Sequence, residues 1–416
     1  SYGVALFKSD SNVIENNAFS QNDDNAVLVD SSGNIVRSNN FLHKQRQAYD
    51  SDGNTWQANY WDDYSGVDSD GDGFGDTPYL ITGTVADNMP GMAPYPEQFV
   101  PVPPFVPAEF HETWQEGQGI SENTTWENCA RELKGWLLIH NGATLTITHC
   151  TLTAAPLTEG MNNTIWVQPG SRLHIYNSAL QGDGLDSYFS IVVNTGAGLI
   201  IKDSRVYYAG DWGGNGGIQI SGNGAVIENT EIVGNYTCID TRGDSANHRF
   251  ADNRISDCVD GIVLDGSHNS VIENNVISEC VSAAIFLGNT ANTQVISNTI
   301  EGAMLGLGLY GGPDNLVRGN RIGSSSIGLI ATGSGNTCYY NNFLDNGTFS
   351  PGFGWGQGQA WDIFGGNNWD YQGEGNYWSD YTGTDTDGDG IGDTPYTIPP
   401  NGIDHYPLMA PCTSAD

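Results

Sequence analysis

Apolar residues recur at a nearly fixed interval along most of this chain. A small or polar residue, any residue and an apolar residue form a short phrase that returns every 22 to 28 residues. The apolar member falls at Leu152, Leu180, Val206, Ile232, Ile255, Ile277, Ile300, Ile322 and Leu344. A second column, two residues earlier, reads Cys150, Ser178, Ser204, Thr230, Asn253, Asn275, Asn298, Asn320 and Asn342. A repeat of this length predicts a solenoid.

Each repeat has a suitable length for one turn of a parallel β-helix. About 22 residues can hold three short strands and three bends, and stacking at ~4.8 Å places every strand beside its copy in the next turn. The aliphatic column then forms a continuous core, and each asparagine amide can bond to its copy in the next turn. A leucine-rich horseshoe is the main alternative, but its leucine-rich consensus is missing. We therefore expect an all-β, right-handed parallel β-helix, since parallel crossovers are right-handed.

The chain opens with the same repeat. Residues 3–19 align without a gap on residues 261–277, and a second turn ends at Leu42. We therefore expect residues 1–58 to hold the last turns, about two, of a first β-helix. Residues 108–346 are expected to form a second β-helix with its N-terminal cap.

A longer duplication follows each run of repeats. Residues 59–81 match residues 376–398 at 17 of 23 positions. Because both copies directly follow a last repeat, we expect residues 59–93 and 347–416 to be C-terminal caps whose aromatic side chains cover the core. The proline-rich stretch 94–107 between the first cap and the second helix favours an extended linker.

Each cap contains an acidic loop with the pattern DxDxDGxGD. Alternate aspartates in a tight loop direct their oxygens at one centre, and hard oxygen ligands suit Ca²⁺. Tyrosine replaces the glutamate that would complete an EF-hand. A solvated acidic turn is the alternative, but crowded carboxylates repel one another without a cation, so we expect structural calcium. The expected ligands are Asp68, Asp70, Asp72, Phe74 (by its carbonyl) and Asp76, and in the second cap Asp385, Asp387, Asp389, Ile391 (by its carbonyl) and Asp393.

The charge of the chain limits its partners. Lys and Arg number 14 against 49 Asp and Glu, which gives a net charge of −35. Such a field repels DNA and anionic membranes, so we expect no nucleic-acid partner. No long apolar run occurs, so we expect no membrane insertion. An acidic, lysine-poor surface fits an extracellular or cell-surface protein, and four sequons are candidate glycosylation sites: Asn123, Asn162, Asn235 and Asn346.

The cysteines leave two alternatives open. Cys258 and Cys280 each lie three residues after the apolar column in adjacent turns, and stacking at ~4.8 Å brings them within disulfide range. A buried ladder of free thiols is equally compatible with this spacing. No partner follows from the sequence for Cys129, Cys238, Cys338 or Cys412.

The repeats and caps resemble right-handed β-helix proteins of the NosD-like, carbohydrate-binding and sugar-hydrolase type, which are pectate-lyase-like solenoids. The phrase GNYWSDYTGTDTDGDGIGDTPYTI, followed by DHYPLM, is similar to a C-terminal signature of archaeal surface and exported proteins. The resemblance implies periplasmic copper handling or sugar chemistry. Copper sites need clustered Met, Cys or His, whereas His140, His149 and His174 fall in different turns.

Sugar cleavage would need clustered carboxylates. The turn surfaces carry Asp23, Asp24, Asp183, Asp186, Asp240, Asp257 and Asp260, but the GHG and RIK motifs of polygalacturonases are missing. We therefore assign no catalytic residue. A surface lined by aromatic residues could bind glycans without cleaving them. The best such cluster is Trp355, Trp361, Trp369 and Trp378, with packing inside the cap as the alternative.

The short first helix bears on function. About three repeats are usually needed to hold a core, and its first strands would present unpaired backbone groups. These strands could stack on another subunit, pack on the second helix, or belong to a longer tandem array. We expect a non-enzymatic structural protein (a sheath, surface-layer or filament subunit) that self-associates through the open ends of its turns and carries glycans. The alternative is an extracellular polysaccharide-binding or polysaccharide-cleaving β-helix module.

Overall fold

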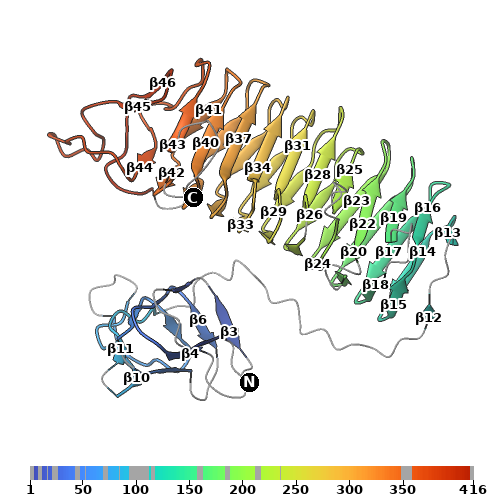
Figure 1. Ribbon diagram of the computed structural model, residues 1–416, viewed down its shortest axis with the longest axis horizontal. Coiled ribbons are helices and arrows are strands. Elements are labelled where there is room, and N and C mark those ends of the chain that lie inside the picture. Colours follow the sequence, from blue (N-terminus) through green and yellow to red (C-terminus); the bar gives the residue numbers. More distant parts are fainter. Residues whose placement is uncertain are drawn as a thin grey trace. The chain divides into compact units, whose positions relative to one another are not determined.

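The chain forms two compact units, residues 1–99 and 100–416 (Figure 1). Every regular element in the described part of the chain is a β-strand, and that part includes no helix that could cross a membrane. The computed structural model describes residues 4–7, 12–15, 17–20, 27–42, 47–51, 53–68, 74–83, 85–92, 112–113, 118–156, 163–182, 188–210, 217–234, 236–347 and 358–412.

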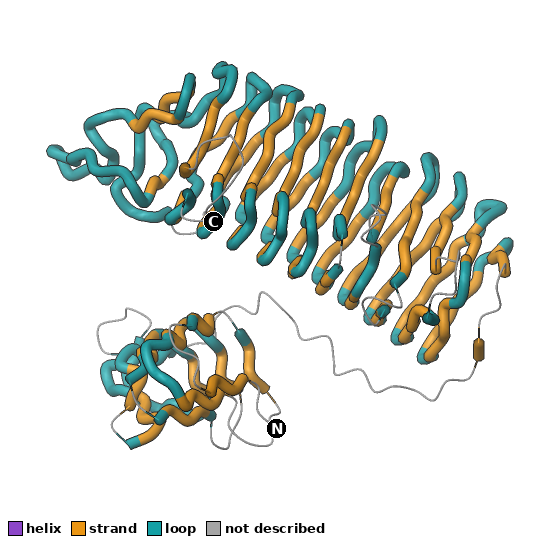
Figure 2. Tube along the Cα trace, in the orientation of Figure 1, coloured by secondary structure: helices purple, strands orange, loops and turns teal. Residues whose placement is uncertain are grey.

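The larger unit is a right-handed parallel β-helix with three long sheets, as the repeat predicts (Figures 1 and 2). Sheet A consists of β12 (Glu112–Thr113), β15 (Ala130–Leu133), β18 (Thr151–Ala154), β21 (Ala179–Gln181), β24 (Arg205–Tyr207), β27 (Glu231–Val233), β30 (Arg254–Ser256), β33 (Val276–Ser278), β36 (Thr299–Glu301), β39 (Arg321–Gly323), β42 (Asn342–Leu344) and β44 (Tyr377–Trp378).

Sheets B and C complete each turn. Sheet B consists of β13 (Gln118–Ile120), β16 (Trp136–Ile139), β19 (Asn163–Val167), β22 (Phe189–Val193), β25 (Ile218–Ile220), β28 (Ile239–Arg242), β31 (Ile262–Asp265), β34 (Ala283–Gly288), β37 (Leu305–Tyr310), β40 (Ile327–Ala331) and β43 (Gly358–Asp362). Sheet C consists of β14 (Thr124–Glu127), β17 (Thr144–Thr148), β20 (Arg172–Tyr176), β23 (Gly198–Lys202), β26 (Val226–Glu228), β29 (Arg249–Ala251), β32 (Val271–Glu273), β35 (Gln294–Ile296), β38 (Leu316–Arg318) and β41 (Thr337–Tyr339). A hairpin of β45 (Tyr396–Ile398) and β46 (Gly402–Asp404) follows.

The register of sheet A confirms the apolar column up to Ile322. Its members pair in order from Leu152 onwards, and all are at most 3% exposed. The expectation is wrong in the next turn, where Phe343 rather than Leu344 pairs with Ile322. This turn is one residue shorter than the turn before it, so both columns arrive one residue early.

A ladder of buried amides runs along the bend between sheets C and A. The backbone N–H and Nδ2 of Asn275 both donate to Oδ1 of Asn298, each at 2.9 Å, and Asn298 donates in the same way to Asn320. The ladder extends from Asn253 through Asn341, not Asn342, to Asn376. Every hydrogen bond between two asparagines of the ladder is donated towards the following turn, so the ladder has a direction.

The smaller unit has three turns, one more than the sequence suggested. The strands are β1 (Val4–Phe7), β2 (Val13–Glu15), β3 (Ala18–Ser20), β4 (Val27–Asp30), β5 (Ile35–Arg37), β6 (Asn40–Leu42), β7 (Ala48–Asp50), β8 (Thr55–Gln57), β9 (Tyr60–Trp61), β10 (Tyr79–Thr82) and β11 (Val85–Asp87). Its third turn was missed because Trp56 and Trp61 take the buried positions that aliphatic residues hold elsewhere. Phe41 stacks on Trp61 with ring centroids 4.1 Å apart.

The cysteine pairing matches neither alternative fully, because Cys258 forms a disulfide but not with Cys280. Cys258 is bonded to Cys238, with Cα atoms 6.0 Å apart, and Cys280 is a buried free thiol. Equivalent positions in successive turns direct their side chains in parallel, whereas a disulfide needs Cβ atoms that approach each other. Cys238 and Cys258 occupy non-equivalent positions of adjacent turns, so their side chains can meet. Burial raises the pKa of the Cys280 thiol to about 12.

Replacing one amide of the ladder by a carboxylate should destabilise the larger unit. In Asn298→Asp, the donor to Ile272 O and Asn320 Oδ1 is lost and a buried charge faces two acceptors. We expect a loss of about 3 kcal/mol in unfolding free energy, measured by urea titration.

The exposed Asn292 provides the matched control, since Asn292→Asp makes the same chemical change outside the core. Equal effects of the two substitutions would contradict a stabilising role for the ladder.

Candidate functional site

The asparagine ladder between sheets C and A has a counterpart in the smaller unit. In each unit this ladder ends on a buried aspartate of the cap. In the larger unit, the backbone N–H of Asn376 and the indole Nε1 of Trp378 donate to Asp404 Oδ2 at 2.7 and 2.9 Å. In the smaller unit, Asn59 and Trp61 donate to Asp87 Oδ2 at 2.9 and 3.2 Å. A carboxylate only accepts hydrogen bonds, so it satisfies donors that have no further turn to meet.

A second amide ladder closes in the same way. Asp362 accepts from an asparagine amide at 2.9 Å and from Trp369 Nε1 at 3.0 Å. Asp50 accepts from an asparagine amide and from Trp56 Nε1, both at 2.7 Å. Sequence reasoning missed these four aspartates as a group, although Asp87 and Asp404 are equivalent if the alignment of the two caps is continued beyond residues 81 and 398. All four are at most 1% exposed.

The terminal carboxylate of the larger unit has a perturbed acidity. Burial raises the pKa of Asp404 to about 6, although hydrogen bonds from Asn376, Trp378 and Tyr406 oppose the shift. Burial disfavours the charged form, and the donors recover part of this cost. The cap therefore holds a group that titrates between pH 4 and pH 7.

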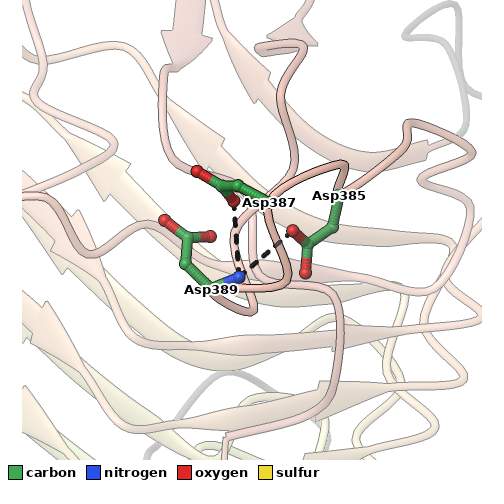
Figure 3. A group of neighbouring side chains, drawn as sticks. All are labelled: Asp385, Asp387 and Asp389. Carbon is green, nitrogen blue, oxygen red and sulfur yellow. Dashed lines mark hydrogen bonds between the residues drawn. The ribbon is translucent and has the colours of Figure 1, made fainter.

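The acidic loop of the second cap brings three of its predicted ligands together. Carboxylate oxygens of Asp385, Asp387 and Asp389 all lie within 4.8 Å of one another (Figure 3). Both oxygens of Asp385 are held by loop amides, with Gly388 N at 2.7 Å and Gly390 N at 2.9 Å. The loop therefore folds around its own carboxylates and leaves several oxygens directed to one region, which suits a hard cation.

Asp393 does not join this group. Its Oδ2 accepts from the backbone N–H of Thr386 at 2.9 Å and from the Thr386 hydroxyl at 2.5 Å. These hydrogen bonds hold the pKa of Asp393 below its ordinary value. These bonds hold Asp393 at the base of the loop, and its role as a ligand stays a prediction.

The first cap has the same backbone frame. Gly75 N donates to Pro90 O at 2.8 Å, as Gly392 N donates to Pro407 O at 2.8 Å. The Tyr64 hydroxyl donates to Thr77 O at 2.6 Å, matching the bond from Tyr381 in the second cap. Asp68, Phe74 and Asp76 lie within this frame. Asp70 and Asp72 lie outside the described residues.

Glycine is required beside the cap tyrosine. A Cβ atom at Gly392 would lie 2.1 Å from the Tyr381 hydroxyl, and one at Gly75 would lie 2.0 Å from the Tyr64 hydroxyl. The two tyrosines therefore fill the space that these glycines leave. This explains why the GxGD part of the motif accompanies a tyrosine upstream in both copies.

The tryptophans of the predicted glycan cluster have separate positions. Trp369 and Trp378 are 1% exposed and pack in the cap core, which is the alternative given above. Trp361 lies on the outer surface of sheet B, packed with Phe286 and Tyr310 among others. Trp355 lies outside the described residues.

Of the candidate surface carboxylates, three lie in the described part of the chain: Asp240, Asp257 and Asp260. Asp240 and Asp260 lie near one another at sheet B, where Asp260 Oδ1 accepts from Ala283 N at 3.0 Å. Asp257 occupies a left-handed bend, with a φ of 56°. Four of the predicted carboxylates lie outside the described residues: Asp23, Asp24, Asp183 and Asp186.

One sequon is excluded as a modification site in the folded chain. Asn346 is 8% exposed, and its Nδ2 donates to Ile322 O and to Gln359 Oε1, both at 2.9 Å. The nitrogen that would carry a glycan is therefore buried and occupied. Asn123 is exposed, whereas Asn162 and Asn235 lie outside the described residues.

Comparison with known proteins identifies the family. The family model described as periplasmic copper-binding protein (NosD) matches residues 147–383, more than half of the chain. The chain belongs to the NosD family. Among curated proteins, none matches it.

Several solved structures are similar to this NosD-family chain at low identity. The periplasmic alginate epimerase AlgG is 16% identical with a TM-score of 0.47, over 54% of this chain and 61% of that one. The Dettilon tailspike protein is 15% identical with a TM-score of 0.39, over 60% and 59%. A tailspike of E. coli bacteriophage HK620, solved with a pentasaccharide, is 11% identical with a TM-score of 0.40, over 64% and 59%. The chain thus spans about three fifths of each structure.

The described residues do not fit a copper site. Within the described ranges, the one close group of three or more potential metal ligands is Asp385, Asp387 and Asp389. Copper prefers thioether, thiolate or imidazole ligands, whereas carboxylates suit hard cations. The described histidines do not gather into such a group, and His248 is buried beside Phe250.

The acidity of Asp404 gives the larger unit a specific pH dependence. Its folded pKa of about 6 lies above the ordinary value of 3.8, so its contribution to stability is complete below pH 3.8 and is lost as pH rises through 6. We expect wild type to lose up to about 3 kcal/mol of unfolding free energy relative to Asp404→Asn between pH 4 and pH 7.

The measurement is urea unfolding of both proteins at several pH values. Asp404→Asn keeps one acceptor oxygen, so it should fold. A difference between the two proteins that stays constant with pH would rule out this titration.

Proposed function

We propose that this chain is an exported, non-enzymatic structural protein whose two β-helical units are closed by calcium-braced caps. One observation carries the proposal. The same closure, with a ladder-ending aspartate, a stacked tryptophan and anchored segments on both sides of the acidic motif, is built twice in one chain. A repeated closure of this kind stabilises the ends of solenoids, where core and backbone would otherwise meet water.

The acidic loop is mechanically connected to the ladder. Gly390 O in the loop accepts from Met409 N at 3.0 Å, and the preceding Leu408 N donates to Asn376 O at 2.9 Å. Asn376 is the last amide of the ladder. Ordering of the loop by a cation would therefore restrain the strand that covers the final rung.

Three observations support calcium as the cation. The aspartates alternate in the sequence, their oxygens converge in the second cap, and the loop amides already hold Asp385 in place. Neighbouring carboxylates repel one another, and a divalent cation removes this repulsion. Asp385, Asp387 and Asp389 would hold the ion in the second cap. Asp68, Asp70 and Asp72 would hold it in the first, with backbone carbonyls such as those of Ile391 and Phe74.

Export is supported by the family description, which is periplasmic, and by the Cys238–Cys258 disulfide. Disulfides persist in oxidising compartments. The net charge of −35 keeps such a protein soluble. We propose an extracellular or cell-surface position, with Asn123 as the exposed sequon available to a glycan.

Assembly through the ends of the turns is the proposed structural role. β1, β2 and β3 each lie at the edge of a sheet, and so do β12, β13 and β14. Edge strands accept further strands from another chain. The proposed partner is therefore a second copy of this protein, joined in a filament or lattice.

Calcium should stabilise the protein through the second cap. We expect millimolar Ca²⁺ to raise the melting temperature and EDTA to lower it, with about 3 kcal/mol of stabilisation at a hundredfold excess over the dissociation constant. The double variant Asp387→Asn/Asp389→Asn should lose the part of this response that belongs to the larger unit. Differential scanning calorimetry resolves the two units if they unfold separately.

Glu279→Gln is the control, because it removes an exposed carboxylate outside the caps. A calcium response unchanged in the double variant, or no response in wild type, would contradict the calcium proposal.

Assembly should be visible directly. Negative-stain electron microscopy of purified protein in Ca²⁺ should show end-to-end particles whose number increases with protein concentration. Monodisperse single particles at all concentrations, with and without EDTA, would contradict self-association.

A further inference from the structure

We propose that the outer face of sheet B docks a second copy of this chain, which packs against it side by side and antiparallel. The proposal goes beyond the end-to-end assembly proposed above, because it uses the flank of the solenoid instead of its ends. It rests on the distribution of charge over this face and on the way its side chains match one another across a two-fold axis.

The strand register defines the outward positions of this face. Ile285 and Leu287 are fully buried in the core, so Phe286 between them faces outward, because side chains alternate along a strand. The register carries this position from β16 to β43 as a central column. The column consists of Leu138, Trp166, Val192, Gln219, Asp240, Val263, Phe286, Gly308, Ile330 and Trp361.

The two ends of this face are apolar. At one end Trp136 and Trp166 lie on the neighbouring strands β16 and β19 and are 41% and 37% exposed. At the other end Phe286 stacks on Tyr310 with ring centroids 4.9 Å apart, and Trp361 belongs to the same cluster. The outward positions of β16, β19, β22, β34, β37, β40 and β43 hold no charged residue. Charge is therefore confined to the middle of the face, on β28 and β31.

This distribution favours a second copy as the occupant. Two copies of a chain with a net charge of −35 repel each other in most orientations, because carboxylates meet carboxylates. The uncharged ends of sheet B are regions where two copies can approach without that penalty. A lipid surface is a poorer match, since the charged strands β28 and β31 interrupt the apolar face.

A two-fold axis makes the face self-complementary if it runs parallel to the strands, between β28 and β31. Such an axis reverses the strand order, so that β28 faces the partner's β31 and β16 faces the partner's β43. Bulky side chains then meet smaller or flatter ones. The facing pairs in the central column are Leu138 with the partner's Trp361, Trp166 with the partner's Ile330, and Val192 with the partner's Gly308.

The same axis pairs the charges of the middle strands. Arg242 and Asp265 are partners in the register of one copy, so each Arg242 faces the partner's Asp265 across the axis and two reciprocal ion pairs form. The Arg242 side chain is 57% exposed and bonds to Asp240 through Nε and Nη2 at 2.6 and 2.5 Å. This contact orients the guanidinium, which has further N–H donors for a second carboxylate. Complementary charges of this kind fix the register of an interface.

The size of the face suits a stable dimer. The ten strands from β16 to β43 extend over about 43 Å at ~4.8 Å per spacing, and a strand of five residues is about 16 Å long. The face therefore offers roughly 700 Å² per copy, or about 1,400 Å² in total, which lies within the range of specific protein interfaces.

Sedimentation velocity and small-angle X-ray scattering of the full chain test the proposal. The buffer contains Ca²⁺ and about 0.3 M NaCl, which screens the repulsion between the two net charges. We expect a reversible monomer–dimer equilibrium in which the cross-section of the particle increases with protein concentration. End-to-end assembly lengthens the particle without thickening it, so the failure of either proposal is seen separately.

A charge exchange tests the predicted pairing. Arg242→Asp and Asp265→Arg should each weaken the dimer on the order of tenfold or more, because each removes both ion pairs and places like charges opposite each other. The double variant Arg242→Asp/Asp265→Arg should recover most of this affinity, since the reversed pairs form across the axis. Trp166→Glu introduces a charge into an apolar end at an exposed position and should also weaken the dimer.

Arg172→Asp is the matched control, because it makes the same charge reversal at an exposed position of sheet C. The control should dimerise like wild type, and circular dichroism should confirm folding of every variant. The proposal is overturned if wild type stays monomeric or lengthens without thickening, if the double variant stays as weak as the single variants, or if the control weakens the dimer as much as Arg242→Asp.

Discussion

The structure depends on the directed hydrogen bonding of its asparagine amides. The Oδ1 atom of each buried asparagine accepts from the asparagine of the turn before it. Its N–H groups donate to the asparagine of the turn after it, so each turn needs the next one to complete its hydrogen bonds. Such a chain cannot end on another amide, because the last N–H groups would be buried without an acceptor. Asp50, Asp87, Asp362 and Asp404 provide the missing acceptors. The ladder thus determines the chemistry of the cap.

The same carboxylates position the aromatic lid of each core. Every ladder-ending aspartate also accepts from a tryptophan indole, and the indoles of Trp61 and Trp378 stack on Phe41 and Phe343 of the preceding turn. The same residues therefore end the hydrogen-bonded ladder and cover the apolar core. Because the same residues serve both purposes, the whole cap sequence, including its acidic loop, is duplicated as one unit rather than as separate motifs.

The solenoid and its columns could be predicted from the sequence, because residues that are buried once per turn recur at a regular spacing as isoleucine and asparagine. The sequence also predicted the acidic loop because ligand spacing is local. It failed where the outcome depends on side-chain direction or on an altered turn length. Cys258 pairs with Cys238 through non-equivalent positions, and Phe343 replaces Leu344 after a shortened turn.

The parallel ladder of sheet and amide bonds has a mechanical consequence. Hydrogen bonds between successive turns run along the axis of the larger unit, so a pulling force applied at its two ends would load them in series. The weakest interface between turns would then yield first while the others remain closed. A disulfide between adjacent turns, such as Cys238–Cys258, would act as a fixed stop near the middle of the unit and limit how far a tear could spread.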